Sequence, residues 1–273
     1  MLLPILAALL LQQPDFAAGG PHQVTVSEEG PDCTLFLPQG ARGKAPVILW
    51  GNGTRSRVPQ YAPMLRHWAS HGFIVAAANT NSAGPGAPLL ACLDHLAKAH
   101  GDKADLSKVG ASGHSQGGGG ALMAARDARI KATAPIQAYT RGLGFQAPAI
   151  TAQHAPILLL TGGADTTAGG ETDQKPVFDG AKVPVFWATL KDSPHTEPAS
   201  AEAASGQYRV VTTAWFRWRL MGDQAAGAWF RGETCAVCRD PRWTVKTLPG
   251  RVVTSTTDPT PGGREVSTYE QLF

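Results

Sequence analysis

The chain of 273 residues contains no internal repeat, no phosphate-binding P-loop and no dinucleotide-binding glycine fingerprint. It also has little net charge, because 24 lysines and arginines stand against 21 aspartates and glutamates and leave +3 at pH 7. That charge is too small and too scattered to indicate a nucleic-acid-binding surface. We therefore expect no nucleic acid among its partners, and nothing in the sequence implies a metal or an organic cofactor.

Long apolar runs are also missing, apart from a short one at residues 1–11. That run is too short to cross a bilayer as a helix, so no stable membrane span is expected. Small residues follow at 17–20, where a cleavage site is expected. The pattern predicts a signal peptide over residues 1–19 and a secreted or periplasmic protein, although no lysine or arginine precedes the apolar run.

The chain has only four cysteines, a number that fits an oxidising compartment and permits three disulfide pairings. We predict Cys33–Cys92 together with Cys235–Cys238, because the last two residues form one tight Cys-x-x-Cys. A redox or zinc motif is the alternative for that pair. The absence of partner histidines nearby and of a thioredoxin-like βαβ context favours the structural role.

Strand-like and helix-like segments alternate, which predicts an α/β protein with a mostly parallel central sheet flanked by helices. Strands are expected at 33–37, 47–50, 73–77, 109–112, 132–136, 157–161 and 185–190. Helices are expected at 61–70, 88–100, 118–126 and 208–221, with another near 225–230. We predict one domain over residues 20–250 and a flexible tail over 251–273, where threonine, serine, proline and glycine dominate.

The stretch Gly113 to Gly118 reads Gly-His-Ser-Gln-Gly-Gly and matches the pattern G-x-S-x-G. In α/β-hydrolases this pattern forms the tight strand-to-helix turn that exposes a nucleophilic serine. Gly113 and Gly117 lack the side chains that would collide across such a turn. The pattern predicts the α/β-hydrolase fold with Ser115 as the nucleophile, although G-x-S-x-G also occurs in ordinary glycine-rich turns.

A serine nucleophile needs a base and an orienting acid, which in this fold follow it in the order Asp or Glu, then His. Asp165 follows the apolar run 156–161, and His195 follows the run 183–190. Both are therefore expected at the carboxyl ends of parallel strands, where open α/β sheets bind ligands. The competing residues are Asp173, Asp179 and Asp192 for the acid and His67, His71, His114 and His154 for the base.

An acyl-transfer site also needs backbone donors for the oxyanion of the tetrahedral intermediate. The N–H of Gln116, the residue after the nucleophile, is the expected first donor. The second is expected from the loop after strand 47–50, and we assign it to Gly53. Asn52 and Thr54 are the alternatives in that loop, and both are expected to contact substrate. An ordinary β-turn is the other interpretation, because Asn-Gly favours turns.

Residues 113–120, with four consecutive glycines after Gln116, are followed by Ala-Thr-Ala-Pro-Ile at 132–136. In these motifs the chain resembles the polyesterase–cutinase branch of α/β-hydrolases, which contains bacterial cutinases and poly(ethylene terephthalate) hydrolases. It is also similar to dienelactone-hydrolase-like and chlorophyllase-like esterases. The segments ending at Asp165 and His195 match the acid and base segments of that branch, and the resemblance covers about residues 30–221.

The resemblance implies a shallow cleft without a large lid, acting on short-chain or polymeric esters. It also implies an aromatic clamp beside the oxyanion hole, which falls on Gly53 here, and a tryptophan after the alanine-proline strand, which falls on Tyr139. Tyr139 is therefore expected to support an acyl or aromatic group. Losing the clamp counts against polyester activity. Gln116 replaces a frequent methionine, and Ser115 argues against the cysteine-dependent reaction of dienelactone hydrolases.

These features predict a serine carboxylic-ester hydrolase that uses Ser115, His195 and Asp165, with a small-molecule or polymeric ester as substrate. Lipase, amidase or acyltransferase activity on the same three residues is an alternative. A catalytically silent binding module of the same fold is another, although an intact triad in sequence order counts against it.

Overall fold

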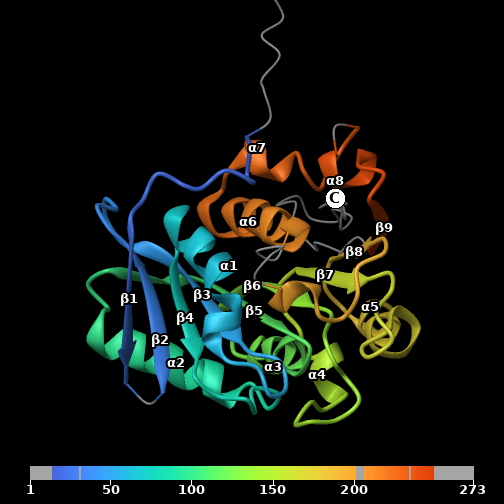
Figure 1. Ribbon diagram of the computed structural model, residues 1–273, viewed down its shortest axis with the longest axis horizontal. Coiled ribbons are helices and arrows are strands. Elements are labelled where there is room, and N and C mark those ends of the chain that lie inside the picture. Colours follow the sequence, from blue (N-terminus) through green and yellow to red (C-terminus); the bar gives the residue numbers. More distant parts are fainter. Residues whose placement is uncertain (1–13, 31, 201–205, 234, 249–273) are drawn as a thin grey trace, which may run out of the picture.

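The computed structural model describes residues 14–30, 32–200, 206–233 and 235–248 (Figure 1). Within them lies one nine-stranded sheet of strand order β1-β2-β4-β3-β5-β6-β7-β8-β9. Its strands are β1 (Val24–Glu29), β2 (Cys33–Pro38), β3 (Ala45–Gly51), β4 (Ile74–Ala78), β5 (Ala104–His114), β6 (Ile130–Ile136), β7 (Ile157–Gly162), β8 (Val185–Leu190) and β9 (Trp243–Leu248). The predicted tail, and residues 1–13 of the predicted signal peptide, lie outside the described residues.

The sheet is mostly parallel, as the alternation of segments predicts. The neighbours from β4 through β3, β5, β6 and β7 to β8 pair in parallel. Only β1, β2 and β9 pair antiparallel, at the two ends of the sheet. Strand β4 is buried at every position, which fits a parallel strand covered on both faces. The carboxyl ends of β3, β5, β7 and β8 therefore meet at one edge.

Helices cover both faces of the sheet (Figure 1). On one side lie α1 (Val58–Ser70), α6 (Gly206–Met221), α7 (Gln224–Gly227) and α8 (Ala236–Arg239). On the other lie α2 (Ala87–Ala99), α3 (Gln116–Ala124) and α4 (Pro148–Thr151), while α5 (Lys175–Gly180) follows the irregular turn after β7. The tryptophans of α6, Trp215 and Trp218, are buried in the core cluster that includes α1, so this helical face packs against the sheet.

The structure contains two edge strands, β1 and β9, that were not among the predicted strands. Their sequences, Val-Thr-Val-Ser-Glu-Glu and Trp-Thr-Val-Lys-Thr-Leu, alternate apolar and polar residues only in part and are half exposed. Helix α3 begins at Gln116, two residues before the predicted start, because the turn at Ser115 leads directly into the helix. No helix among the described residues is long and apolar enough to span a membrane.

Both predicted disulfides are present, Cys33–Cys92 between β2 and α2 and Cys235–Cys238 at the start of α8. Phe16 lies inside the predicted signal peptide, yet it is only 3% exposed and packs against the ring of Trp229 at 5.4 Å. Its carbonyl also contacts His67 Nε2 at 2.9 Å. Phe16 is therefore part of a hydrophobic core cluster of the described residues.

Candidate active site

Ser115 stands on the turn between β5 and α3, with φ 55° and ψ −119°. A positive φ costs a residue with a side chain about 1–3 kcal/mol and persists only where the surroundings enforce it. The two glycines of the pattern explain how the turn closes. A Cβ on Gly113 would lie 2.2 Å from the carbonyl oxygen of Gly117, and one on Gly117 would lie 2.0 Å from that of Gly51. Both positions therefore exclude any side chain.

The structure brings Ser115, His195 and Asp165 into one hydrogen-bonded series. Asp165 follows β7, and His195 lies in the loop after β8. His195 Nδ1–H donates to Asp165 Oδ2 at 2.7 Å, which leaves Nε2 without a proton. Ser115 Oγ–H donates to that Nε2 at 2.9 Å. The imidazole is thus placed to take the serine proton, and Asp165 to stabilise the imidazolium that results.

Both carboxylate oxygens of Asp165 have donors. Its Oδ1 accepts from the backbone N–H groups of Thr167 at 2.8 Å and Ala168 at 2.9 Å. Burial alone would raise the pKa of Asp165, but the hydrogen bonds from His195, Ala168 and Thr167 outweigh it and lower this pKa. The side chain is fully buried, and it holds its negative charge because hydrogen bonds replace the lost water.

Buried residues that the sequence reasoning did not identify hold the loop that carries His195. Gln137 has φ 45° and follows β6, and its Nε2 donates to the carbonyl of Pro194 at 3.0 Å and to Tyr208 Oη at 3.1 Å. Tyr208 Oη in turn contacts Ser193 Oγ at 2.8 Å. Gln137 and Tyr208 are fully buried. These buried contacts fix the backbone on both sides of the Ser193–Pro194 bond and so position the neighbouring imidazole.

A second buried series connects the loop after β3 with the histidine loop. The N–H of Gly53 donates to Tyr61 Oη at 3.3 Å, and Tyr61 O–H donates to His114 Nδ1 at 2.8 Å. His114 Nε2–H then donates to the backbone carbonyl of His195 at 2.9 Å. Burial first, and the nearby His195 next, lower the pKa of His114 to about 3, so this ring is neutral at pH 7. His114 therefore supports His195 without acting as the base.

The expected oxyanion residues have different surroundings. The N–H of Gln116 lies in the first turn of α3, where no residue of the helix can accept it. The N–H of Gly53 is directed at Tyr61, as described. Asn52 is fully buried, with Oδ1 accepting from Trp50 Nε1 at 3.0 Å and Nδ2 donating to the carbonyl of Ala78 at 2.8 Å. The Asn52 side chain thus holds the loop after β3.

Thr54 is exposed, and its N–H has no acceptor within the part of the chain that the structure describes. Its Oγ1 lies 3.5 Å from Gln116 Oε1, which brings the loop after β3 together with the start of α3. Tyr139 is half-buried, and its N–H donates to the Ser115 carbonyl at 2.9 Å. The Arg141 guanidinium lies 4.9 Å from the centre of the Tyr139 ring. Thr54 and Tyr139 thus lie beside the serine.

The competing acids and bases are engaged elsewhere. Asp173 is fully buried, and it accepts from the Thr140 N–H at 2.9 Å and from Arg141 Nε at 3.1 Å, so it anchors the loop after β6. His67 and His71 contact the carbonyls of Phe16 and Ala18 in the segment that precedes β1. The remaining competitors, Asp179, Asp192 and His154, are exposed.

A groove of about 880 Å³ lies beside the serine site rather than on it. It runs between the β1–β2 hairpin and the start of α1, and Asn52, Ser56 and Arg57 form part of its wall. Ser115 and His195 do not line it. Near the serine site Leu143 is 49% exposed, and its carbonyl accepts from Gln116 Nε2 at 3.2 Å.

The chain is similar in sequence to known proteins. A family model described as PET hydrolase-like matches residues 12–230. The chain is 28% identical over 198 residues to Cutinase est2 of Thermobifida alba, covering 67% of this chain and 62% of that protein. It is 27% identical over 191 residues to the bis(hydroxyethyl) terephthalate hydrolase of Streptomyces coelicolor, covering 65% and 59%. The chain thus spans about three fifths of the length of these curated relatives.

Proposed function

The chain belongs to the PET hydrolase-like family, and from that premise we propose that it is a serine hydrolase that cleaves carboxylic esters on the α/β-hydrolase fold. The observation that carries the proposal is the series from Ser115 Oγ through His195 to Asp165, with contacts of 2.9 and 2.7 Å. The relatives named as cutinases and as a terephthalate ester hydrolase support the same bond type.

In the proposed mechanism His195 Nε2 takes the proton of Ser115 as Oγ attacks the ester carbonyl. Asp165 keeps the imidazole in the required tautomer and stabilises its positive charge. The imidazolium then gives its proton to the leaving alcohol, and an acyl group remains on Ser115. A water molecule deprotonated by His195 attacks this acyl-enzyme and releases the acid.

For the oxyanion we propose the N–H groups of Gln116 and Thr54. The Gly53 N–H, the sequence-based choice for the second donor, is already bonded to Tyr61 Oη at 3.3 Å. The adjacent Thr54 N–H has no acceptor among the described residues. Each such donor supports transition-state stabilisation of about 3 kcal/mol in serine hydrolases. Gly53 then serves as the glycine that lets its loop pass close to His114, where a Cβ would lie 3.1 Å from Nδ1.

The substrate we propose is a short-chain or polymeric ester, bound with its acyl side against Tyr139. Tyr139 is half-buried, and its N–H donates to the Ser115 carbonyl at 2.9 Å, which supports this placement.

We also propose that the protein acts outside the cytoplasm, in the periplasm or secreted. Two disulfides support an oxidising compartment. The apolar run at the start would then act as the export signal. Because Phe16 is buried in the domain, we place any cleavage before Asp15 rather than at the small residues 17–20.

A p-nitrophenyl ester series from acetate to palmitate tests the proposal, with wild type, Ser115→Ala and Ser107→Ala compared. Ser107 is an exposed serine at the start of β5 and serves as the matched control. Hydrolysis that is highest with short chains, lost in Ser115→Ala and kept in Ser107→Ala is the expected result. A folded wild type with no activity on any ester would contradict the proposal and favour amides or a binding role.

A further inference from the structure

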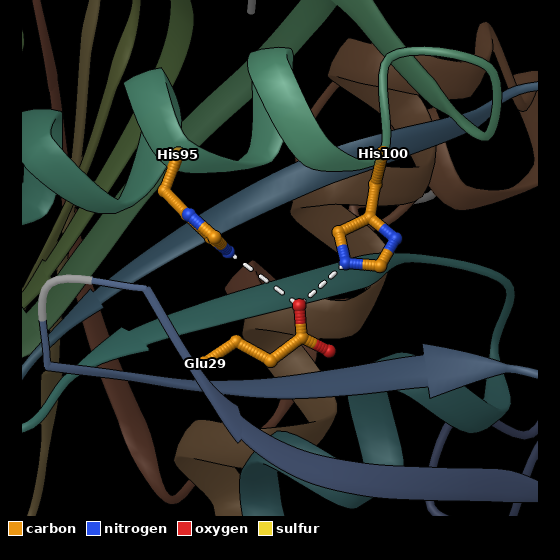
Figure 2. Close-up of side chains that lie close together, drawn as sticks. All are labelled: Glu29, His95 and His100. Carbon is orange, nitrogen blue, oxygen red and sulfur yellow. Dashed lines mark hydrogen bonds and ion pairs between the residues drawn. The ribbon is translucent and has the colours of Figure 1, made fainter.

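Three side chains able to bind a metal ion meet away from the serine site, on edge strand β1 and helix α2 (Figure 2). Glu29 is the last residue of β1, His95 lies on α2, and His100 directly follows that helix. Glu29 Oε2 lies 2.6 Å from His100 Nε2 and 3.5 Å from His95 Nε2. Both imidazole rings therefore direct the same type of nitrogen at one carboxylate oxygen.

The surroundings hold these side chains in place. Ser27 Oγ–H donates to Glu29 Oε1 at 2.6 Å, which leaves Oε2 facing the imidazoles. Gly30, with φ +62°, packs so closely on the His95 ring that a Cβ there would lie 2.4 Å from Cγ and Nδ1. The backbone of His100 is fixed by its N–H, which donates to the Leu96 carbonyl at 2.9 Å.

A disulfide adds to this rigidity. Cys33 lies on β2, the partner of β1, and is bonded to Cys92, one helical turn before His95 on α2. The strand pair and the helix that supply the three ligand atoms are thus joined covalently close to the cluster. A preformed arrangement of this kind lowers the ordering cost of binding an ion.

We propose that Glu29, His95 and His100 form a zinc-binding site. Two imidazole nitrogens and one carboxylate oxygen are a ligand set that zinc accepts, with metal–ligand bonds of about 2.0–2.2 Å. Tetrahedral zinc then requires about 3.3 Å between ligand atoms. The three atoms all lie within 4.8 Å of one another, and two separations are 2.6 and 3.5 Å, so small side-chain rotations suffice.

The cluster is also accessible. The side chains of His95, His100 and Glu29 are 19%, 15% and 26% exposed, so an ion can enter and a water molecule can complete its coordination. Zinc binds imidazole and carboxylate groups in their deprotonated forms, so binding should weaken in acid. The bound ion would tie the edge strand to α2.

The test is equilibrium dialysis and calorimetric titration of the full chain, stripped of metal and purified without a polyhistidine tag, with Zn²⁺ alone. All four cysteines are in disulfides, so no thiol competes for the ion. We expect one zinc per chain with micromolar affinity or better. At a hundredfold excess over Kd, zinc should raise Tm by roughly 5–10 °C.

Variants assign the ligands. We expect zinc binding to weaken by at least about 10–100-fold in each of His95→Ala, His100→Ala and Glu29→Gln. A loss of this size is known for residues that only hydrogen-bond to metal ligands, so losing a ligand should cost at least as much. His154→Ala removes an exposed histidine outside the cluster and should bind as wild type does. Binding that survives both histidine substitutions would overturn the assignment.

If a variant fails to fold, measurements on wild-type protein alone still test whether the zinc site exists. Co²⁺ bound at a four-coordinate nitrogen and oxygen site gives intense visible absorption that zinc should abolish, and a wild type without stoichiometric zinc or this spectrum would refute the site. The site is independent of ester hydrolysis, so Ser115→Ala should bind zinc like wild type.

Discussion

Replacing Tyr61 with phenylalanine removes one hydroxyl from the series between Gly53 and His195 and nothing else. The hydroxyl is fully buried, accepts from the Gly53 N–H at 3.3 Å and donates to His114 Nδ1 at 2.8 Å. A buried polar group left without a partner costs about 1–3 kcal/mol. Because the longer contact with Gly53 is the weaker one, we expect a total loss of about 2–4 kcal/mol, which lowers Tm by roughly 10 °C at this size.

Activity should fall as well, because His114 loses the bond that sets its tautomer. Its Nε2–H holds the His195 carbonyl at 2.9 Å, and a shift of the catalytic imidazole by about 1 Å costs on the order of a hundredfold in rate. We therefore expect kcat in Tyr61→Phe to drop between about ten- and a hundredfold, with KM little changed. The assay is p-nitrophenyl acetate hydrolysis well below Tm, beside thermal unfolding by circular dichroism.

Thr212→Val provides the matched control. Thr212 is also buried, and its hydroxyl accepts from Trp68 Nε1 at 3.0 Å between α6 and α1. Its loss should lower Tm to a similar extent and leave kcat unchanged. If Tyr61→Phe lowers Tm but keeps the wild-type kcat, the series does not position His195 and the reasoning is refuted.

Further predictions concern the acid, a disulfide and pH. Asp165→Asn should lower kcat about 10⁴-fold without unfolding the protein, because the wrong imidazole tautomer then faces Ser115; a loss below tenfold would exclude Asp165 as the orienting acid. Replacing Cys33 and Cys92 together by serine opens a link between residues 59 apart and should cost about 4 kcal/mol in chemical denaturation; an unchanged midpoint would contradict this. The pKa of His114 falls from 6.5 to about 3 on folding, so its unfolded form takes up a proton first as pH falls. Stability should therefore be undiminished by His114 above pH 6.5 and decline between 6.5 and about 3, and His114→Gln should flatten that decline in urea titrations.

Much of the fold could be predicted because the central strands are continuous apolar runs that end in glycines or polar loops. The run at 157–162 is such a case, and it ends three residues before Asp165. Edge strand β9 was missed because Trp243–Leu248 is half exposed and precedes a polar segment. Phe16 was assigned to the signal peptide because no local pattern indicates that it packs on Trp229, more than two hundred residues away.

The candidate site, too, could be predicted only in part from the sequence. Ser115 is marked by the G-x-S-x-G pattern, because a Cβ on Gly113 would collide with the Gly117 carbonyl within the turn itself. The bond between Tyr61 and His114 spans 53 residues, and no sequence spacing indicates it. The donor assigned to Gly53 depended on the direction of one N–H group, which only the contact with Tyr61 defines.

The central claim is that Ser115 is a nucleophile activated by His195. Labelling with a fluorophosphonate probe, followed by peptide mass spectrometry, tests it most directly. We expect one adduct, on Ser115, with none formed by Ser115→Ala and labelling slowed by more than about a thousandfold in His195→Ala. An unlabelled but folded wild type, or an adduct on another residue that persists in Ser115→Ala, would contradict it.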